Sequence, residues 1–198
     1  MLADFQKQRI ALFGTSADPP TTGHKTILQW LAKRYDLVAV WAADNPFKAK
    51  QTSLEHRAGM LAVLIDSLTT AQQNITLSQD LSDRRTIETV KKARKLWGTS
   101  TEFTLVMGSD LLKQISKWYC IDHLLKEVQL LIVPRPGYPI EKVHLEELAS
   151  LGGRWEIAEF QTPSVSSTAY RQGKKREAIA QPVEDYILRK QLYACQDR

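Results

Sequence analysis

Residues 10–24 read IALFGTSADPPTTGH, an apolar run that leads through a turn into an amphipathic helix. The run Ile10–Phe13 predicts a buried strand, because consecutive apolar residues that end at a glycine suit a strand covered on both faces. Residues Thr22–Arg34 carry apolar side chains three and four positions apart, which predicts a helix with one buried stripe. A strand, a turn and a helix in this order begin a β-α-β unit.

The same alternation of apolar runs and helix-period segments continues along the chain. Further strands are expected at residues 37–42, 75–77, 103–107, 129–133 and 155–160, and further helices at residues 54–68 and 86–97. Strands joined by single helices predict an α/β fold of the Rossmann-like, doubly wound kind, with a mostly parallel sheet and helices on both faces. Ligands of such sheets bind beyond the carboxyl ends of the strands, which is where the functional residues are to be sought.

The composition is that of a globular protein. The 198 residues, with a mass of 22.5 kDa, are expected to form one domain over residues 1–198, and neither disorder nor a disulfide scaffold is indicated. The longest apolar run, Leu37–Ala43, is too short to cross a bilayer, and the first residues do not resemble a leader, so we expect a cytoplasmic protein without a membrane partner. Cys120 and Cys195 form no metal-ligand pattern.

A net charge of +5 favours anionic partners, and leaves open whether these are nucleic acids or small phosphates. The basic segments that could bind a nucleic acid are Lys91–Lys95 and Arg171–Arg176, although a solvated helix face explains such a run equally simply. Because the sequence lacks the interleaved aromatic and basic residues of an RNA-recognition motif, we expect no nucleic-acid partner.

The turn Gly14–His24 lies at the predicted carboxyl end of the first strand. The N-terminus of the following helix offers unpaired N–H groups and the positive end of its dipole, so it attracts phosphate, and Gly23 allows close approach. His24 would project there. Neither G-x-G-x-x-G nor a P-loop is present, so another kind of phosphate cradle is needed. The alternative is a tight loop with capping threonines and a surface histidine.

A second candidate segment, Val165–Arg171, begins with serines and a threonine that suit a helix N-cap. Its hydroxyl groups and the guanidinium of Arg171 also form a set of donors for phosphate oxygens. The simpler alternative is an ordinary helix start.

Both segments resemble motifs of the nucleotidylyltransferase superfamily. Asp18–His24 resembles D-P-x-[HT]-x-G-H, and Val165–Arg171 resembles I-S-S-T-x-x-R. Weaker matches follow one another between them as in the nicotinate or nicotinamide mononucleotide adenylyltransferases: NPFK at 45–48, HRAGM at 56–60, RTIET at 85–89, MGSD at 107–110, Trp118 and PRPG at 134–137. Two positions depart from that family. Thr21 replaces its usual histidine, as is common in phosphopantetheine adenylyltransferases, and Arg85 replaces its usual tyrosine.

The resemblance implies adenylyl transfer from ATP to nicotinate mononucleotide, and possible use of nicotinamide mononucleotide, giving a dinucleotide and pyrophosphate in NAD biosynthesis. It implies Mg²⁺ that enters with ATP, without a metal site built by the protein. The catalytic residues it indicates are His24 and Arg171. The residues it assigns to ATP are Gly14, Thr15, Ser16, Thr21, Gly23, His24, Gly108, Asp110, Ser166, Ser167, Thr168 and Arg171. Those it assigns to the mononucleotide are Lys48, Arg85, Thr86, Trp118 and Arg135.

Within these sets, the resemblance and the chemistry suggest separate roles. His24 would stabilise charge on the transferred phosphate, and Thr21 would donate a hydrogen bond to it. Arg171, with Ser167 and Thr168, would hold the β- and γ-phosphates. Asp110 would contact the ribose and Trp118 the mononucleotide base. No protein nucleophile or general base is needed, because a phosphate monoester, with a second pKa near about 6, is already largely dianionic at neutral pH.

Alternatives to this interpretation stay open from the sequence alone. Thr21 favours a phosphopantetheine adenylyltransferase or a cytidylyltransferase, whereas the chain length and the later motifs favour the mononucleotide enzymes. A nucleic-acid-binding module, a catalytically silent relative and a homo-oligomer are also possible. Individually, Lys48 could be a loop charge, Trp118 a core aromatic, Asp110 a helix cap and Arg135 a surface residue.

Overall fold

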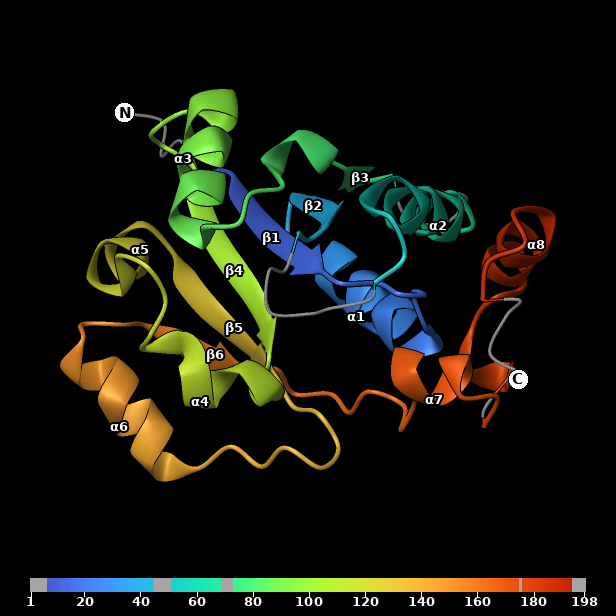
Figure 1. The fold of residues 1–198 in the computed structure, drawn as a ribbon. Coiled ribbons are helices and arrows are strands. Elements are labelled where there is room, and N and C mark those ends of the chain that lie inside the picture. Colours follow the sequence, from blue (N-terminus) through green and yellow to red (C-terminus); the bar gives the residue numbers. More distant parts are fainter. Residues whose placement is uncertain (1–6, 45–50, 69–72, 175, 194–198) are drawn as a thin grey trace.

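The computed structural model describes residues 7–44, 51–68, 73–174 and 176–193, and its centre is one six-stranded sheet (Figure 1). The strand order is β3-β2-β1-β4-β5-β6, and all five pairings are parallel. The strands are β1 (Arg9–Thr15), β2 (Leu37–Ala42), β3 (Ile75–Leu77), β4 (Glu102–Gly108), β5 (Gln129–Val133) and β6 (Trp155–Ile157). The expected α/β class is confirmed, and the sheet is parallel throughout.

Helices cover both faces of this sheet, as expected for a doubly wound fold. One face packs against α1 (Thr22–Ala32) and α2 (Leu54–Asp66), and α8 (Gln181–Arg189) packs on α2. The other face packs against α3 (Thr86–Trp97), α4 (Leu112–Ile115), α5 (Ile121–Glu127) and α6 (Lys142–Ser150). The short helix α7 (Ser167–Arg171) lies near the start of α1 in Figure 1. Short 3₁₀ turns occupy Gln79–Leu81, Ser109–Leu111 and Arg176–Ala178.

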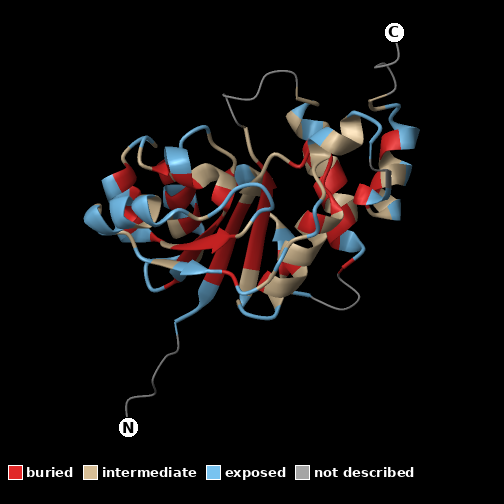
Figure 2. Cartoon of the chain, turned by 90° about the horizontal axis from the view of Figure 1, so that it is seen from below, coloured by how far each residue is buried: buried red, intermediate tan, exposed pale blue. Residues whose placement is uncertain are grey.

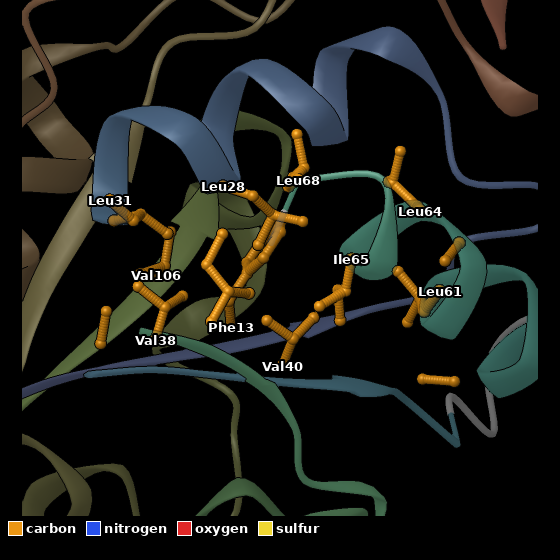
Figure 3. Close-up of a cluster of buried hydrophobic side chains, with 14 of the residues drawn as sticks. Phe13, Leu28, Leu31, Val38, Val40, Leu61, Leu64, Ile65, Leu68 and Val106 are labelled. Carbon is orange, nitrogen blue, oxygen red and sulfur yellow. The ribbon is translucent and has the colours of Figure 1, made fainter. Parts of the chain in front are cut away.

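The alternation of side chains along the strands gives each face its own hydrophobic core. In β1, Ala11 and Phe13 join the core beneath α1 and α2, whereas Ile10 and Leu12 join the core beneath α3, α4 and α5. Figure 2 shows buried residues along the central strands, and Figure 3 shows side chains from α1 and α2 meeting those of β1, β2 and β4. Burying one such large side chain contributes about 1.5–3 kcal/mol, so these two cores fix the sheet.

Three elements end earlier than the sequence predicts. The helix expected to reach Arg34 ends at Ala32, and the helix expected to reach residue 68 ends at Asp66. Just beyond the end of each helix, the backbone forms hydrogen bonds between residues three apart, such as that from the N–H of Arg34 to the carbonyl oxygen of Leu31 at 2.9 Å. The last strand ends at Ile157 rather than Phe160, because the Phe160 ring packs against the Trp30 ring, with the ring centroids 5.0 Å apart.

The parallel sheet brings the carboxyl ends of β1, β2, β4 and β5 to one edge. The turn after β1, the last two residues of the 107–110 motif and the 134–137 motif lie in the segments that follow these strands. No helix among the described residues is both long enough and apolar enough to span a bilayer.

Candidate active site

His24 lies in the first turn of α1, where its ring connects that helix to the end of β1. The backbone N–H of Thr21 donates to Nδ1 of His24 at 2.9 Å, so the neutral ring carries its proton on Nε2. That Nε2 atom lies 2.9 Å from the hydroxyl oxygen of Thr15, the last residue of β1. The ring is therefore held at one nitrogen, and its second nitrogen is a donor at the carboxyl edge of the sheet.

Thr21 is the N-cap of α1, and only 2% of its surface is exposed. Its hydroxyl oxygen lies 2.9 Å from Nδ1 of His24. The direct phosphate contact expected of Thr21 therefore competes with an existing contact to the His24 ring. A role in orienting that ring suits the geometry better.

The second motif docks directly onto the turn that follows β1. The hydroxyl of Ser167 donates to the carbonyl oxygen of Pro19 at 2.7 Å. The guanidinium of Arg171 donates to the carbonyl oxygen of Asp18, and its Nη1 atom also lies 3.6 Å from the Asp18 carboxylate. Ser166 caps α7 as expected, accepting from the N–H of Ala169 at 3.1 Å. Two segments about 150 positions apart in sequence thus form one unit.

A buried arginine joins the loop after β1 to the loop after β2 at this edge. Arg57 in α2 is 3% exposed, and it donates to the carbonyl oxygens of Ser16, Ala43 and Thr52 at 2.8–2.9 Å. Burial lowers the pKa of Arg57, and the negative charge of Asp18 opposes this effect. The sequence analysis did not assign a role to Arg57. Its burial could have been predicted, because Arg57 stands three places before Met60 and four before Leu61 and so lies on the buried face of the helix.

Gly14 and Gly23 serve different purposes in the turn. A Cβ atom on Gly14 would lie 2.6 Å from the ring of Trp41, the paired residue of β2, so no larger residue fits there without movement. A Cβ on Gly23 would meet Thr21 and Val165 at 3.4 and 3.5 Å, which are ordinary contact distances. Ser16 and Thr15 lie half-buried between these glycines.

On the far side of β1, the segment after β4 meets the segment after β5. The carboxylate of Asp110 accepts from Nη1 of Arg135 at 2.9 Å. Buried Ser109 accepts from the backbone N–H of Arg135 at 3.0 Å and donates to the carbonyl of Tyr138 at 2.7 Å. Asp110 and Arg135, which the resemblance assigns to ATP and to the mononucleotide respectively, therefore lie together, next to Gly108.

The remaining residues expected at the mononucleotide lie around the start of α3. The Arg85 guanidinium lies over the ring of Tyr119, 4.2 Å from its centroid, and Tyr119 directly follows Trp118 in sequence. Thr86 is the first residue of α3, and Trp118 is half-buried against the second core. Lys48 and the rest of its NPFK motif lie outside the described residues. Thr168, which the resemblance assigns to ATP, is exposed in α7.

The basic run in α3 is largely neutralised within the chain. Lys91 pairs with Glu88, Lys92 with Asp83 and Arg94 with Glu127. These pairs are characteristic of a solvated helix face rather than of a surface that binds nucleic acid.

A cavity of about 410 Å³ lies at the opposite edge of the sheet, among the first residues of β1, β4 and β5. Three of its six basic side chains, Lys7, Arg34 and Arg94, pair with Glu102, Glu156 and Glu127 respectively. Its position at the amino ends of the strands separates this cavity from the residues at the carboxyl edge.

The carboxyl edge thus combines a histidine N–H donor, the N-terminus of α1 and the guanidinium of Arg171 around one turn. These are groups that stabilise negative charge on phosphate oxygens. Among the residues that the structure describes, no group of three or more His, Cys, Asp and Glu side chains could hold a metal ion.

Comparisons with known proteins agree with this chemistry. The cytidylyltransferase-like family model matches residues 12–173. A protein of Synechocystis sp., named a probable nicotinate-nucleotide adenylyltransferase, is 45% identical over 93% of this chain and 98% of its own length. The nicotinate-nucleotide adenylyltransferase of Bacillus subtilis is 26% identical over 94% of this chain and 98% of its own.

A solved structure shares the fold. The Plasmodium falciparum nicotinic acid mononucleotide adenylyltransferase complexed with NaAD matches with a TM-score of 0.80 and 21% identity, covering 94% of this chain and 98% of that one. The family match includes both motifs that dock in the structure, and the Synechocystis relative aligns along nearly all of both chains. The chain therefore belongs to the nicotinate-nucleotide adenylyltransferases, within the cytidylyltransferase-like family of nucleotidyltransferases.

Proposed function

We propose that the protein transfers the adenylyl group of ATP to the phosphate of nicotinate mononucleotide, which produces a dinucleotide for NAD biosynthesis and releases pyrophosphate. The observation that carries this proposal is the docking of α7 onto the turn after β1, which brings Arg171 and His24 to the same turn. Family membership supports the choice of reaction, and the 45% identity to the Synechocystis protein supports the choice of the acid mononucleotide.

The reaction needs positioning rather than a protein nucleophile. An oxygen of the mononucleotide phosphate attacks the α-phosphorus of ATP, a P–O bond forms there, and the bond from that phosphorus to the oxygen bridging to the β-phosphate breaks. The electron pair leaves on pyrophosphate. Because both reactants are anions, fixed positive charge and oriented donors supply most of the acceleration.

His24 acts on the phosphate that is transferred. Its Nε2–H can exchange the Thr15 hydroxyl, at 2.9 Å, for an oxygen of the α-phosphate, because Thr15 lies at the edge where that phosphate would sit. The N–H of Thr21 keeps the proton on Nε2 by donating to Nδ1. His24 is thus a donor whose hydrogen bond strengthens as charge builds up in the transition state, and Thr21 positions it.

The β- and γ-phosphates of ATP belong to the second motif. Arg171 supplies the planar, permanently charged fork, and exposed Thr168 supplies a hydroxyl. Ser167 has its hydroxyl on Pro19 O, so we assign it to docking α7 rather than to direct phosphate contact. Asp110 remains the candidate for the ribose, with Arg135 as its ion-pair partner.

Magnesium enters as part of the substrate MgATP. Mg²⁺ keeps several waters and binds phosphate oxygens readily, so it does not require a cage of protein ligands. The buried carboxylate of Asp18 is already engaged by Tyr193 and Arg171, and that of Asp110 by Arg135. These contacts fit a metal that is carried by the triphosphate.

The test is pyrophosphate release from MgATP, measured in parallel with nicotinate mononucleotide, nicotinamide mononucleotide, phosphopantetheine and no acceptor. Turnover with nicotinate mononucleotide and formation of the corresponding dinucleotide are expected. Turnover with phosphopantetheine alone, or with CTP in place of ATP, would replace the proposal by one of the alternative transferases.

A further inference from the structure

Tyr193, the last residue that the structure describes, reaches back to the first motif. Its phenol donates a hydrogen bond of 2.7 Å to Oδ1 of Asp18, which lies 175 positions earlier. The same hydroxyl lies 3.9 Å from the sulfur of Met60 in α2, and the Tyr193 ring meets Tyr170 of α7 edge to face, with the ring centroids 6.2 Å apart. Tyr193 therefore packs between both motifs of the site.

Asp18 is a buried carboxylate that joins four segments. It is 3% exposed. Tyr193 occupies Oδ1, whereas Oδ2 lies 3.4 Å from the N–H of Thr52 and 3.6 Å from Nη1 of Arg171. Because a buried carboxylate is stable only when its oxygens have donors, these contacts depend on one another.

A phenol is suited to this task because it donates without carrying charge. Burial raises the pKa of Tyr193, and its contact with the Asp18 carboxylate raises the pKa further. Tyr193 therefore stays protonated at neutral pH and remains a donor to Oδ1. A cation in its place would compete with Arg171 for the charge of Asp18.

Both contacts of Arg171 with Asp18 use the same nitrogen, Nη1. We propose that Tyr193 is a positioning residue for ATP. By occupying Oδ1 of Asp18, it limits that carboxylate to one nitrogen of Arg171, and the other guanidinium nitrogens are left for the triphosphate. The inference rests on the proposed function, because it assigns Arg171 to ATP.

The variant Tyr193→Phe removes the hydroxyl and keeps the ring. Oδ1 of Asp18 then lacks its donor, and Arg171 is expected to turn a second nitrogen to it in a bidentate pair. The loss of one charge-assisted contact predicts a rise of about tenfold in the KM for ATP. The KM for nicotinate mononucleotide and the kcat are expected to change less than about twofold, because His24 and the mononucleotide side of the site are untouched.

Tyr186→Phe is the matched control. It also removes a tyrosine hydroxyl near the end of the chain, one that contacts Nδ1 of His56 at 3.2 Å and joins α8 to α2. Its KM for ATP should equal that of the wild type, with the thermal midpoints of both variants measured alongside. An equal rise of the KM for ATP in both variants would mean that loosening of the C-terminal segment is the cause, and would overturn the proposal.

A double-mutant cycle with Arg171→Ala identifies the route. If Tyr193 acts through Arg171, Tyr193→Phe has no further effect on the KM for ATP once Arg171 is absent. A tenfold rise that persists in the Arg171→Ala background would overturn the proposal.

Direct binding separates this inference from the proposed function. The dissociation constant of α,β-methylene-ATP, measured by calorimetry, should rise about tenfold in Tyr193→Phe and stay unchanged in Tyr186→Phe. This result would stand even if the wild-type protein released no pyrophosphate with nicotinate mononucleotide. Equal affinity of the wild type and Tyr193→Phe for this analogue would refute the inference and leave the reaction itself untouched.

Discussion

Thr15 Oγ1 lies 2.9 Å from Nε2 of His24, so the last residue of β1 and the first turn of α1 meet at one ring nitrogen. The other ring nitrogen accepts from the N–H of Thr21. A histidine held in this way cannot act as a base at Nδ1, and it presents an N–H at the strand ends. The geometry thus supports hydrogen-bond donation to phosphate rather than proton abstraction.

His24→Ala is expected to lower kcat by about 10²- to 10³-fold, the usual effect of removing one donor to a developing charge. The KM for nicotinate mononucleotide should change little, because the proposed contact is made mainly in the transition state. His123→Ala, which removes an exposed histidine of α5, serves as the control in steady-state assays. An unchanged kcat in His24→Ala would reject the assigned role.

Arg171→Lys is expected to reduce kcat/KM for ATP by about tenfold or more, because a compact ammonium cannot replace a planar fork on two phosphate oxygens. Arg154→Lys, an exposed position at the other end of the sheet, should leave this ratio unchanged. Full activity of Arg171→Lys with ATP would mean that the triphosphate binds elsewhere.

Local patterns were sufficient to predict most of the fold and the turn between β1 and α1. The strands were predicted because apolar runs alternate with helices that each have one apolar stripe, and the position of His24 followed from the turn that ends β1. The docking of α7 onto that turn was implied only by the resemblance to the family. No periodicity in the sequence indicates that Ser167 will contact Pro19.

Contacts between distant segments could not be predicted from the sequence, for a physical reason. The partner of Tyr193 is 175 positions away, and that of Arg135 is 25 positions away on a neighbouring strand end, so both depend on how the sheet orders its strands. The length of β6 was wrong because Phe160 packs on α1, which is a tertiary contact. Arg57 was the exception, since its place on the apolar face of α2 could have been noticed.

Arg57→Met is expected to destabilise the fold by about 2–4 kcal/mol, because three loop carbonyls lose their donor and buried Asp18 loses a neighbouring positive charge. The measurement is the free energy of unfolding in urea. Arg57→Lys should recover only part of the loss, since an ammonium does not match the arrangement of the fork. A stability within 0.5 kcal/mol of the wild type, a change of about the size seen for surface substitutions, would contradict the role assigned to Arg57.

Substitution by alanine should affect fold stability differently at Gly14, near the end of β1, and at Gly23, in the first turn of α1. Gly14→Ala places a methyl group 2.6 Å from Trp41 and should cost about 1–3 kcal/mol of stability. Gly23→Ala meets only ordinary contacts, so its stability should be close to that of the wild type, whereas its KM for ATP should rise if phosphate approaches the helix start closely. Thermal unfolding and steady-state kinetics on both variants decide this, and equal losses of stability would contradict it.

Nicotinate and nicotinamide mononucleotide differ in one substituent, a carboxylate in the first and a neutral amide in the second. A cation beside that group would favour the acid by about 1.5–3 kcal/mol, or roughly ten- to a hundredfold in kcat/KM. Arg135 already pairs with Asp110 at 2.9 Å, so much of its charge is compensated. Arg85 lies over the neutral ring of Tyr119 and, within the described residues, forms no ion pair with a carboxylate.

Arg85→Gln should therefore reduce the preference for the acid more than Arg135→Gln does. The measurement is the ratio of kcat/KM for the two mononucleotides, determined for the wild type and both variants under identical conditions. Tyr119→Leu should also lower the ratio, because it removes the ring that holds the Arg85 guanidinium. In the wild type that guanidinium lies 4.2 Å from the ring centroid. A larger effect of Arg135→Gln would put the carboxylate beside β5 instead. A wild type that uses both mononucleotides equally would mean that neither arginine distinguishes them.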